Sequence, residues 1–99
     1  MELNADVVVL QNPDVIARQF DDLAFVMHPE RRELHHLNHT SWFVWGSIDG
    51  KRTAEDLAAA VSREYDVDIA ESRRDVLELL RLLLDKDLVR VVKGGLQAS

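Results

Sequence analysis

The chain has 99 residues, and its 12 basic and 18 acidic side chains give a formal charge of −6. This length suits one small domain, and the apolar share of 46% is typical of a globular chain rather than a disordered one. Cysteine is absent, which excludes disulfides, thiolate metal sites and a cysteine nucleophile. No apolar run approaches the length of about 18 residues that a membrane span needs, and the opening residues lack a basic stretch, so we expect a cytoplasmic protein with no membrane partner.

Three short strands are predicted in the first third of the chain, over Asp14–Phe20, Leu23–Met27 and Glu33–Leu37. Each run is rich in apolar residues, and brief polar breaks of turn-forming residues separate it from the next. This spacing is typical of an antiparallel meander. Val7–Leu10, ahead of the meander, predicts either a further strand or a loosely held arm.

Three helices are predicted after the strands, over His39–Ile48, Ala54–Glu64 and Ile69–Lys86. Their apolar residues recur at helical spacing. Asn38 and Thr53 precede the first two helices, and their side chains can accept hydrogen bonds from the free N–H groups at a helix start.

The predicted domain covers residues 13–92 and closes on a strand or wing at Leu88–Val92. Residues 1–12 are predicted to form an N-terminal arm or an extra strand, and residues 93–99 a flexible tail. The fold class is therefore α+β, with a three-stranded antiparallel meander followed by a three-helix unit that resembles a winged helix.

The last predicted helix has more apolar surface than one packing partner needs. At about 100° per residue its apolar side chains span an arc of about 160°, or about 220° when Leu82 is included. A helix that packs on one core needs an arc of only somewhat more than about 100°. Either the strands cover the surplus, or part of it lines a groove for another chain. Arg73, Arg74 and Arg81 would give such a groove a basic edge.

The third predicted strand, Glu33–Leu37, is an edge of the meander. An edge strand has unpaired backbone N–H and C=O groups, with which an incoming peptide can pair. No proline or lysine protects this one. The alternatives are that Leu88–Val92 covers the edge, or that the edge pairs two copies of the chain as a homodimer.

Four histidines, His28, His35, His36 and His39, lie close together in the sequence. If a hairpin pairs His28 with Glu33, a metal site of two histidines and a glutamate is geometrically conceivable with His35. Polar strand residues beside the groove are the favoured interpretation, because no helical pair of ligands and no cysteine assists. Phosphate-binding glycine loops and a GxSxG serine motif are also absent, so we predict no catalytic residue, no metal and no cofactor.

A winged-helix DNA-binding protein is the alternative function. Its recognition helix would have to present polar side chains to the bases, whereas this helix is mostly leucine after Arg74. The acidic charge balance also disfavours contacts with phosphates, so we predict no nucleic-acid partner.

Three motifs follow one another in the middle of the chain. Leu37-Asn38-His39-Thr40-Ser41 is followed by Trp45, Asp49-Gly50 by Thr53 and Leu57, and Tyr65-Asp66-Val67 by Asp75, Val76, Leu79, Leu83 and Leu88. In their order and spacing they resemble the PqqD family over residues 13–92. Ser41 departs from the family's usual alanine, and Asp87 stands where a glycine often precedes the final leucine.

The resemblance implies a non-catalytic recognition element for ribosomally synthesised precursor peptides. Such a domain binds the leader of its precursor as an added strand beside the third strand and against the last helix. It presents the peptide to a modifying enzyme, often a radical S-adenosylmethionine protein. Biosynthesis of the quinone cofactor PQQ is the family's founding role.

The predicted peptide-binding residues combine the edge strand with the last helix. They are Glu33, Leu34, His35, His36 and Leu37 from the strand, and Arg73, Arg74, Val76, Leu77 and Leu80 from the helix. The strand backbone would pair with the leader, and the two arginines would attract acidic leader residues. The predicted core contains Phe25, Trp42, Trp45, Leu57, Val61 and Leu83.

Overall fold

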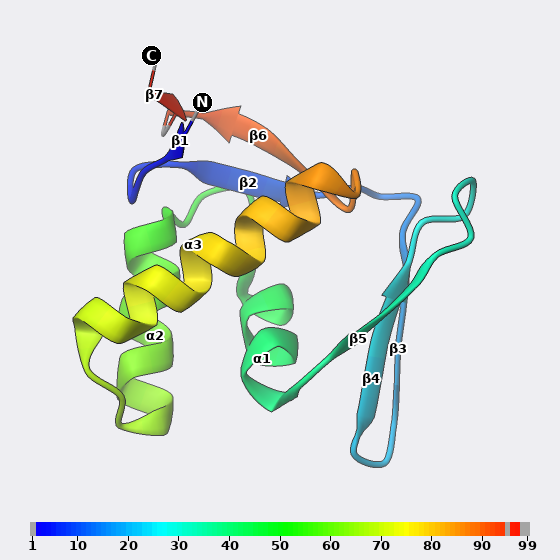
Figure 1. Cartoon of the computed structure of the whole chain (residues 1–99), viewed down its shortest axis with the longest axis horizontal. Helices are drawn as coiled ribbons and strands as arrows, with labels where there is room; N and C mark the ends of the chain where they lie inside the picture. The colour runs from blue at the N-terminus through cyan, green and yellow to red at the C-terminus, as the bar shows by residue number, and fades with distance from the viewer. Residues whose placement is uncertain (1, 95, 98–99) are drawn as a thin grey trace.

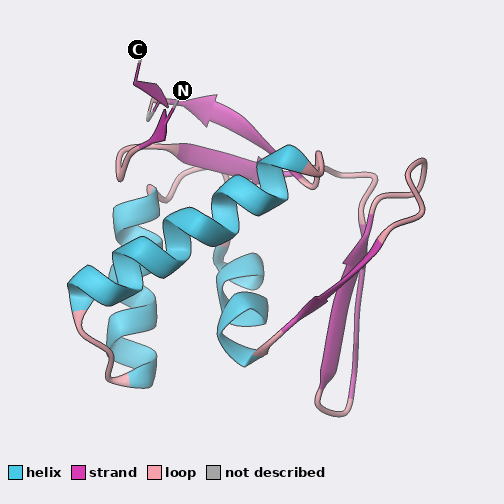
Figure 2. Cartoon of the chain, in the orientation of Figure 1, coloured by secondary structure: helices cyan, strands magenta, loops and turns pink. Residues whose placement is uncertain are grey.

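Short strands and three helices make up the fold in this computed structural model, which describes residues 2–94 and 96–97 (Figures 1 and 2). The helices are α1 (His39–Ser47), α2 (Ala54–Tyr65) and α3 (Ile69–Asp85). The strands are β1 (Glu2–Leu3), β2 (Val8–Gln11), β3 (Ile16–Phe20), β4 (Leu23–Met27), β5 (Leu34–Leu37), β6 (Val89–Lys93) and β7 (Leu96–Gln97). The predicted α+β class, with an antiparallel β3-β4-β5 meander ahead of three helices, is confirmed.

The meander turns one face towards the helices and leaves the other face outside. Ala24, Val26 and Leu37 are buried on the inner face, in keeping with the alternation of side chains along a strand. On the outer face Phe20 and Leu23, which are cross-strand partners, are 61% and 65% exposed. The meander therefore has an apolar outer face as well as a buried inner one.

The helices start where the sequence predicts them to start. The Asn38 side chain accepts a hydrogen bond from the Ser41 N–H at 2.8 Å. Thr53 and Asp56 form a reciprocal capping box at the start of α2, which satisfies two of the N–H groups that a helix start leaves free. The three helix ends lie within one residue of the predicted ends.

Asp87 adopts the left-handed conformation directly after α3, with a φ angle of 57°. This is the conformation that favours glycine, and aspartate is among the few other residues that tolerate it. The Leu88 N–H donates to the Leu83 carbonyl at 2.8 Å, as in a Schellman helix end. Asp87 thus ends the helix at the position where the related family often has glycine.

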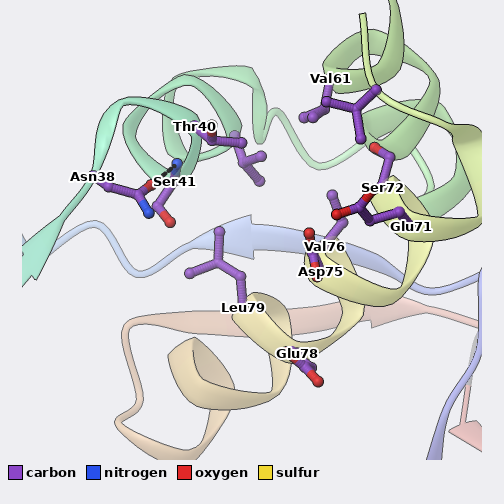
Figure 3. A pocket seen from close by; sticks show the side chains of 12 residues that line it. Asn38, Thr40, Ser41, Val61, Glu71, Ser72, Asp75, Val76, Glu78 and Leu79 are labelled. Carbon is purple, nitrogen blue, oxygen red and sulfur yellow. Dashed lines mark hydrogen bonds between the residues drawn. The ribbon is translucent and has the colours of Figure 1, made fainter. Parts of the chain in front are cut away.

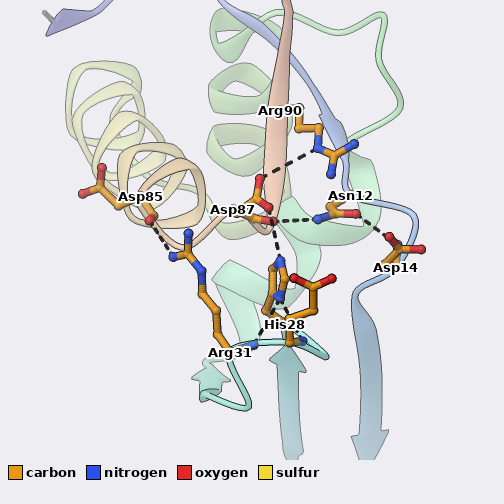
Figure 4. Close-up of polar contacts among 8 residues, drawn as sticks. Asn12, Asp14, His28, Arg31, Asp85, Asp87 and Arg90 are labelled. Atoms are coloured by element: carbon orange, nitrogen blue, oxygen red, sulfur yellow. Dashed lines mark hydrogen bonds and ion pairs between the residues drawn. The ribbon is translucent and has the colours of Figure 1, made fainter.

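A polar cluster around Asp87 joins the meander to the helices (Figure 4). The Asp87 carboxylate lies 3.1 Å from Nε2 of His28, a buried residue directly after β4. Since Nδ1 of His28 accepts from the backbone N–H of Glu30, Nε2 carries the proton and donates to Asp87. The Asn12 side chain donates to the Asp87 carbonyl at 2.9 Å. The sequence alone placed these three residues in separate segments.

The segments near the two ends of the chain form paired strands, and the pair of β2 and β6 packs onto the helices. β2 lies within residues 1–12 and pairs with β6, and Val7, Val8 and Val9 are buried. The Ala54 N–H donates to the Val7 carbonyl at 2.8 Å, which ties this segment to the start of α2. In the predicted tail, Leu96–Gln97 pair with β1, and residues 95, 98 and 99 lie outside the described part of the chain.

The core predicted from the sequence is correct at four positions, because Trp45, Leu57, Val61 and Leu83 are buried. Trp42 is partly buried against this core. The prediction for Phe25 is wrong, because its side chain lies on the outer face of the meander and stacks on Phe20 with the ring centres 6.2 Å apart. The alternation along β4 buries Ala24 and Val26 in its place.

Two glycines offer a matched test of the backbone. Gly50 has a φ angle of 77°, and a Cβ there would lie 3.0 Å from Leu10 Cδ1. Gly50→Ala is therefore expected to lower the free energy of unfolding by about 1–2 kcal/mol. Gly46 lies in α1, where an added Cβ would meet open space. Gly46→Ala is therefore expected to raise the free energy of unfolding by up to about 1 kcal/mol. Urea unfolding measures both, and equal effects of the two variants would contradict the prediction.

No helix in residues 2–94 and 96–97 has the length and apolarity that crossing a membrane requires.

Candidate functional site

One edge of the meander is open. β5 pairs with β4 from Leu34↔Met27 to Leu37↔Ala24. Within residues 2–94 and 96–97, no strand pairs with the other edge of β5. β6 pairs with β2 instead, so the alternative in which Leu88–Val92 covers this edge is wrong. The open edge leaves backbone N–H and C=O groups free to bind an extended peptide.

The side chains of β5 alternate between the two faces of the meander. His35 and Leu37 turn inward, where His35 is partly buried and Leu37 fully so. Leu34 and His36 turn outward and are exposed. Glu33 precedes the strand, and its carboxylate lies 3.6 Å from His35 Nε2 and 3.2 Å from Lys86 Nζ. The last contact joins the start of β5 to the residue that follows α3.

The Lys86 ammonium lowers the pKa of the Glu33 carboxyl by a hydrogen bond and by its charge. Lys86→Gln is therefore expected to raise the pKa of Glu33 towards its ordinary value. Because the folded-state pKa is lowered, this pair stabilises the fold above the ordinary glutamate pKa of about 4.3, and the contribution is lost as the pH falls through the folded-state pKa. NMR titration of the side-chain carboxyl measures the shift. Lys93→Gln is the matched control, and an unchanged Glu33 pKa in Lys86→Gln would contradict the assignment.

A cavity of about 270 Å³ lies between α1 and α3 (Figure 3), and we call it the α1–α3 cavity. Three of its four buried lining side chains are apolar, those of Val44, Val61 and Val76. The first turn of α1 and α3 form opposite rims. The remaining lining residues are Asn38, Thr40, Ser41, Val67, Glu71, Ser72, Asp75, Glu78 and Leu79.

The α1–α3 cavity begins next to the end of β5, because Asn38, the residue that follows Leu37, lines it. A shallower hollow is lined by His36 and Leu37 of β5, by the start of β4 and by the first residues of α1. This hollow and the α1–α3 cavity share Asn38 and Ser41. A peptide paired with β5 and extended past Leu37 would therefore come close to the cavity.

Two flanks of α3 face different parts of the molecule. Leu79 and Asp75 line the α1–α3 cavity on the flank towards β5. Leu77 and Arg74 line a second hollow on the other flank, together with Leu3 of β1, and Glu78 lies between the two and lines both. At about 100° per residue, Leu77 and Leu79 lie about 160° apart around the helix axis, so one peptide strand cannot contact both in the same way.

The structure divides the predicted helix residues into three groups. The first group, on the flank away from the α1–α3 cavity, contains Arg73, Arg74 and Leu77. Arg73 forms a bidentate ion pair with Glu55 of α2, with N–O distances of 2.6 and 3.0 Å. This pair lowers the pKa of Glu55 and raises that of Arg73. Leu80 is fully buried in the core and thus out of reach of a ligand, which corrects its predicted position. Val76 is buried too, but it contributes to the cavity floor.

Several residues of the cavity were missed by reasoning from the sequence. The carboxylates of Glu71, Asp75 and Glu78 form its α3 rim, and Leu79 lies beside them. Helical spacing places Asp75 and Leu79 about 160° from Leu77 around the helix axis, whereas Glu78 is only about 100° away and also lines the hollow of Leu77. It carries no signal for which side faces the strand edge, because that depends on how α3 packs on α2 and β6.

The histidines do not come together as a ligand set. His28 contacts Asp87, and His35 contacts Glu33. Among the residues that the structure describes, no three histidine, aspartate or glutamate side chains are close enough to hold a metal ion.

Comparison with known proteins gives one family and several similar structures. The family model described as coenzyme PQQ synthesis protein D (PqqD) matches residues 24–89, more than half of the chain. No curated protein sequence matches.

Three solved structures share the fold. TbiB1 in complex with the TbiA(beta) leader peptide has a TM-score of 0.73 at 23% identity, covering 89% of this chain and 99% of that one. A lasso peptide synthetase B1 complexed with its leader peptide has a TM-score of 0.73 at 20% identity, covering 83% and 96%. The PqqD truncation of Methylobacterium extorquens PqqCD, described as a functional, stand-alone recognition element for ribosomally synthesised and post-translationally modified peptides, has a TM-score of 0.72 at 25% identity, covering 91% and 95%.

Proposed function

This chain belongs to the PqqD family, and from that premise we propose that it is a non-catalytic peptide chaperone. It binds the leader of a ribosomally synthesised precursor peptide as an added strand and presents the peptide to a modifying enzyme in the cytoplasm. The complexes of TbiB1 and of the lasso synthetase B1 with leader peptides support this proposal, because both proteins share the fold.

The observation that carries the proposal is the open edge of β5 beside the α1–α3 cavity. The backbone groups of residues 33–37 supply hydrogen bonds, each of which contributes about 0.5–1.5 kcal/mol net. The cavity supplies an apolar surface for leader side chains. Pairing by the backbone gives affinity, and the cavity gives specificity.

The modifying enzyme is the second partner that we propose, and a radical S-adenosylmethionine enzyme is the class that we propose for it. The outer face of the meander supports a docking role because Phe20, Leu23 and Leu34 are more than half exposed on it. Exposed apolar patches of this kind are typical of protein–protein contacts. This face stays free when a leader occupies the edge of β5, so both partners can bind at once.

Titration of isotope-labelled protein with a leader tests the proposal. The probe is the N-terminal half of a short peptide whose gene lies beside the gene for this chain. We expect the backbone amides of residues 33–37 to show the largest chemical-shift changes, together with Asn38, Ser41 and Leu79 around the cavity. Binding that leaves the amides of residues 33–37 unchanged would contradict strand addition. A second copy of the chain on the same edge would appear as a concentration-dependent shift without any peptide.

The DNA-binding alternative is not favoured. Arg73 is already paired with Glu55, and the chain carries a formal charge of −6. DNA affinity falls steeply as the salt concentration rises, because it depends on release of counterions, whereas a leader held by backbone pairing and apolar burial is much less sensitive.

A further inference from the structure

We propose that Asp87 is a positioning residue of the leader site. Its carboxylate, acting through His28, holds the open edge of β5 at a fixed place relative to α3. Asp87 is not among the described residues that line the α1–α3 cavity or the hollow at the end of β5, so it acts without touching the leader. This inference rests on the proposed function, because the place of β5 matters for binding only if a peptide pairs with its edge.

The entry to the meander is attached to Asp87. The side chain of Asn12, which is 3% exposed, donates to the Asp87 carbonyl at 2.9 Å, and its backbone N–H donates to the Leu88 carbonyl at 3.0 Å. Asn12 in turn accepts hydrogen bonds from the backbone N–H groups of Asp14 and Val15, just before β3. The start of β3 is therefore fixed to the residue that ends α3.

The turn between β4 and β5 is attached to the same residue through His28 (Figure 4). Nδ1 of His28 accepts from the backbone N–H groups of Glu30 and Arg31 at 3.2 and 3.4 Å, and its carbonyl accepts from the Arg32 N–H at 2.9 Å. Nε2 of the same ring donates to the Asp87 carboxylate at 3.1 Å. Because the turn is built around this ring, the position of the Asp87 carboxylate sets the position of the turn and of the start of β5.

Two further contacts join this turn to the end of α3. The Arg31 guanidinium donates to the Asp85 carbonyl at 3.1 Å, and the Lys86 ammonium lies 3.2 Å from the Glu33 carboxylate. Exposed contacts of this kind contribute little. The contact with Asp87 is better shielded from water, because its donor is a buried histidine. Since shielding strengthens a charge-assisted hydrogen bond, we assign the positioning role to Asp87.

Apolar packing holds the meander on α1 but does not fix its angle to α3. β4 and β5 contact α1, and Ala24, Val26 and Leu37 are buried there. Apolar burial has no preferred direction, whereas a hydrogen bond does. If the contact with Asp87 were lost, the start of β5 would move relative to α3 while its end stayed joined to α1. The arrangement in which one leader reaches both the strand edge and the cavity would then be less populated, and the apparent affinity would fall with that population.

Three variants separate position from stability. Asp87→Gly removes the carboxylate but keeps the helix end, because the φ angle of 57° suits glycine. Asp87→Asn tolerates the same conformation and keeps an oxygen that accepts from His28. Asp21→Gly is the matched control. Asp21 has a φ angle of 52° in the turn between β3 and β4, at the end of the meander away from the end of α3 (Figure 1), and the change removes the same charge.

Affinity is measured with a linear peptide that is selected from a random library against the full chain and that shifts the amides of residues 33–37. Asp87→Gly is expected to lower the affinity about five- to twentyfold, because it removes a hydrogen bond to a charged group that holds the competent arrangement. Asp87→Asn is expected to recover it to within about threefold of the unchanged protein, and Asp21→Gly to stay within about twofold.

Residual dipolar couplings of the backbone amides measure the orientation of the meander without any peptide. In the unchanged protein the couplings of β4, β5 and the helices should fit one alignment tensor. In Asp87→Gly the couplings of β4 and β5 should depart from the tensor of the helices, and in Asp87→Asn they should return to it. A general loss of stability leaves these couplings unchanged while the chain is folded, so they report on position alone.

The outcomes separate this inference from the proposed function. A loss of affinity in Asp87→Gly with altered couplings, both recovered in Asp87→Asn, supports the inference. Unchanged affinity in Asp87→Gly, a loss of affinity with unchanged couplings, or an equal loss in Asp21→Gly overturns the inference and leaves strand addition standing. Unfolding of Asp87→Gly overturns it too, because the residue would then be required for the whole fold. If no selected peptide shifts the amides of residues 33–37, strand addition fails, and the inference fails with it.

Discussion

Leu79→Ala is expected to weaken leader binding by about tenfold to thirtyfold, whereas Leu77→Ala is expected to leave it nearly unchanged. Leu79 lines the α1–α3 cavity beside the open edge of β5, and Leu77 lines the hollow on the other flank of α3. Truncating a leucine that a ligand buries costs about 1.5–2 kcal/mol, which corresponds to this loss of affinity. Isothermal titration or fluorescence anisotropy with the leader measures the difference.

The pair is well matched, because both leucines lie on the same helix and both are partly buried against the core. Each substitution therefore removes a similar amount of packing, and any general loss of stability affects both proteins. In the reverse result, Leu77→Ala would weaken leader binding and Leu79→Ala would leave it unchanged. That result would place the leader along the flank of α3 that carries Arg73, Arg74 and Leu77, as the sequence analysis favoured. Equal losses in both variants would indicate an indirect effect through the core.

Leu80→Ala is expected to lower the free energy of unfolding by about 2–5 kcal/mol. Leu80 is fully buried between the helices, and its truncation would leave a cavity that the neighbouring side chains fill only partly. A loss of this size is a large fraction of the total stability of a small domain, about 5–15 kcal/mol. Urea denaturation followed by tryptophan fluorescence measures it.

Leu82→Ala is the control for this second prediction. Leu82 belongs to the same helix but is 43% exposed, so its truncation should change the free energy of unfolding by less than about 1 kcal/mol. Under conditions in which the protein remains folded, Leu80→Ala should bind the leader with unchanged affinity. A loss of affinity at full stability would show instead that Leu80 is a contact residue, as its place in the sequence pattern suggested.

The structure shows where the charged side chains of α3 lie relative to the two hollows beside this helix. From the sequence, Arg73, Arg74 and Arg81 beside the apolar arc predicted a basic groove and an acidic leader. In the structure Arg73, Arg74 and Arg81 line the hollow beside Leu3 of β1, Glu71 and Asp75 line the α1–α3 cavity, and Glu78 lines both. The predicted contact between these arginines and acidic leader residues stays a prediction.

Local patterns in the sequence determined the elements of this protein. Short apolar runs with polar breaks defined the meander, and Asn38 and Thr53 defined the starts of α1 and α2, because strand alternation and helix capping depend on residues close together in the chain. The order of the motifs also indicated the PqqD family, and hence an edge strand that accepts a peptide.

Only the tertiary structure decided which surfaces meet. The pairing of β6 with β2, which leaves β5 open, depends on contacts between residues about 80 positions apart. The link from His28 to Asp87, which fastens the meander to the end of α3, joins residues 59 positions apart. The rotation of α3 about its axis, which turns Leu79 rather than Leu77 towards the α1–α3 cavity, follows from its packing on α2 and β6. Helical periodicity gives the angles between side chains on one helix. Which of those side chains face the rest of the protein is decided by packing against the neighbouring elements.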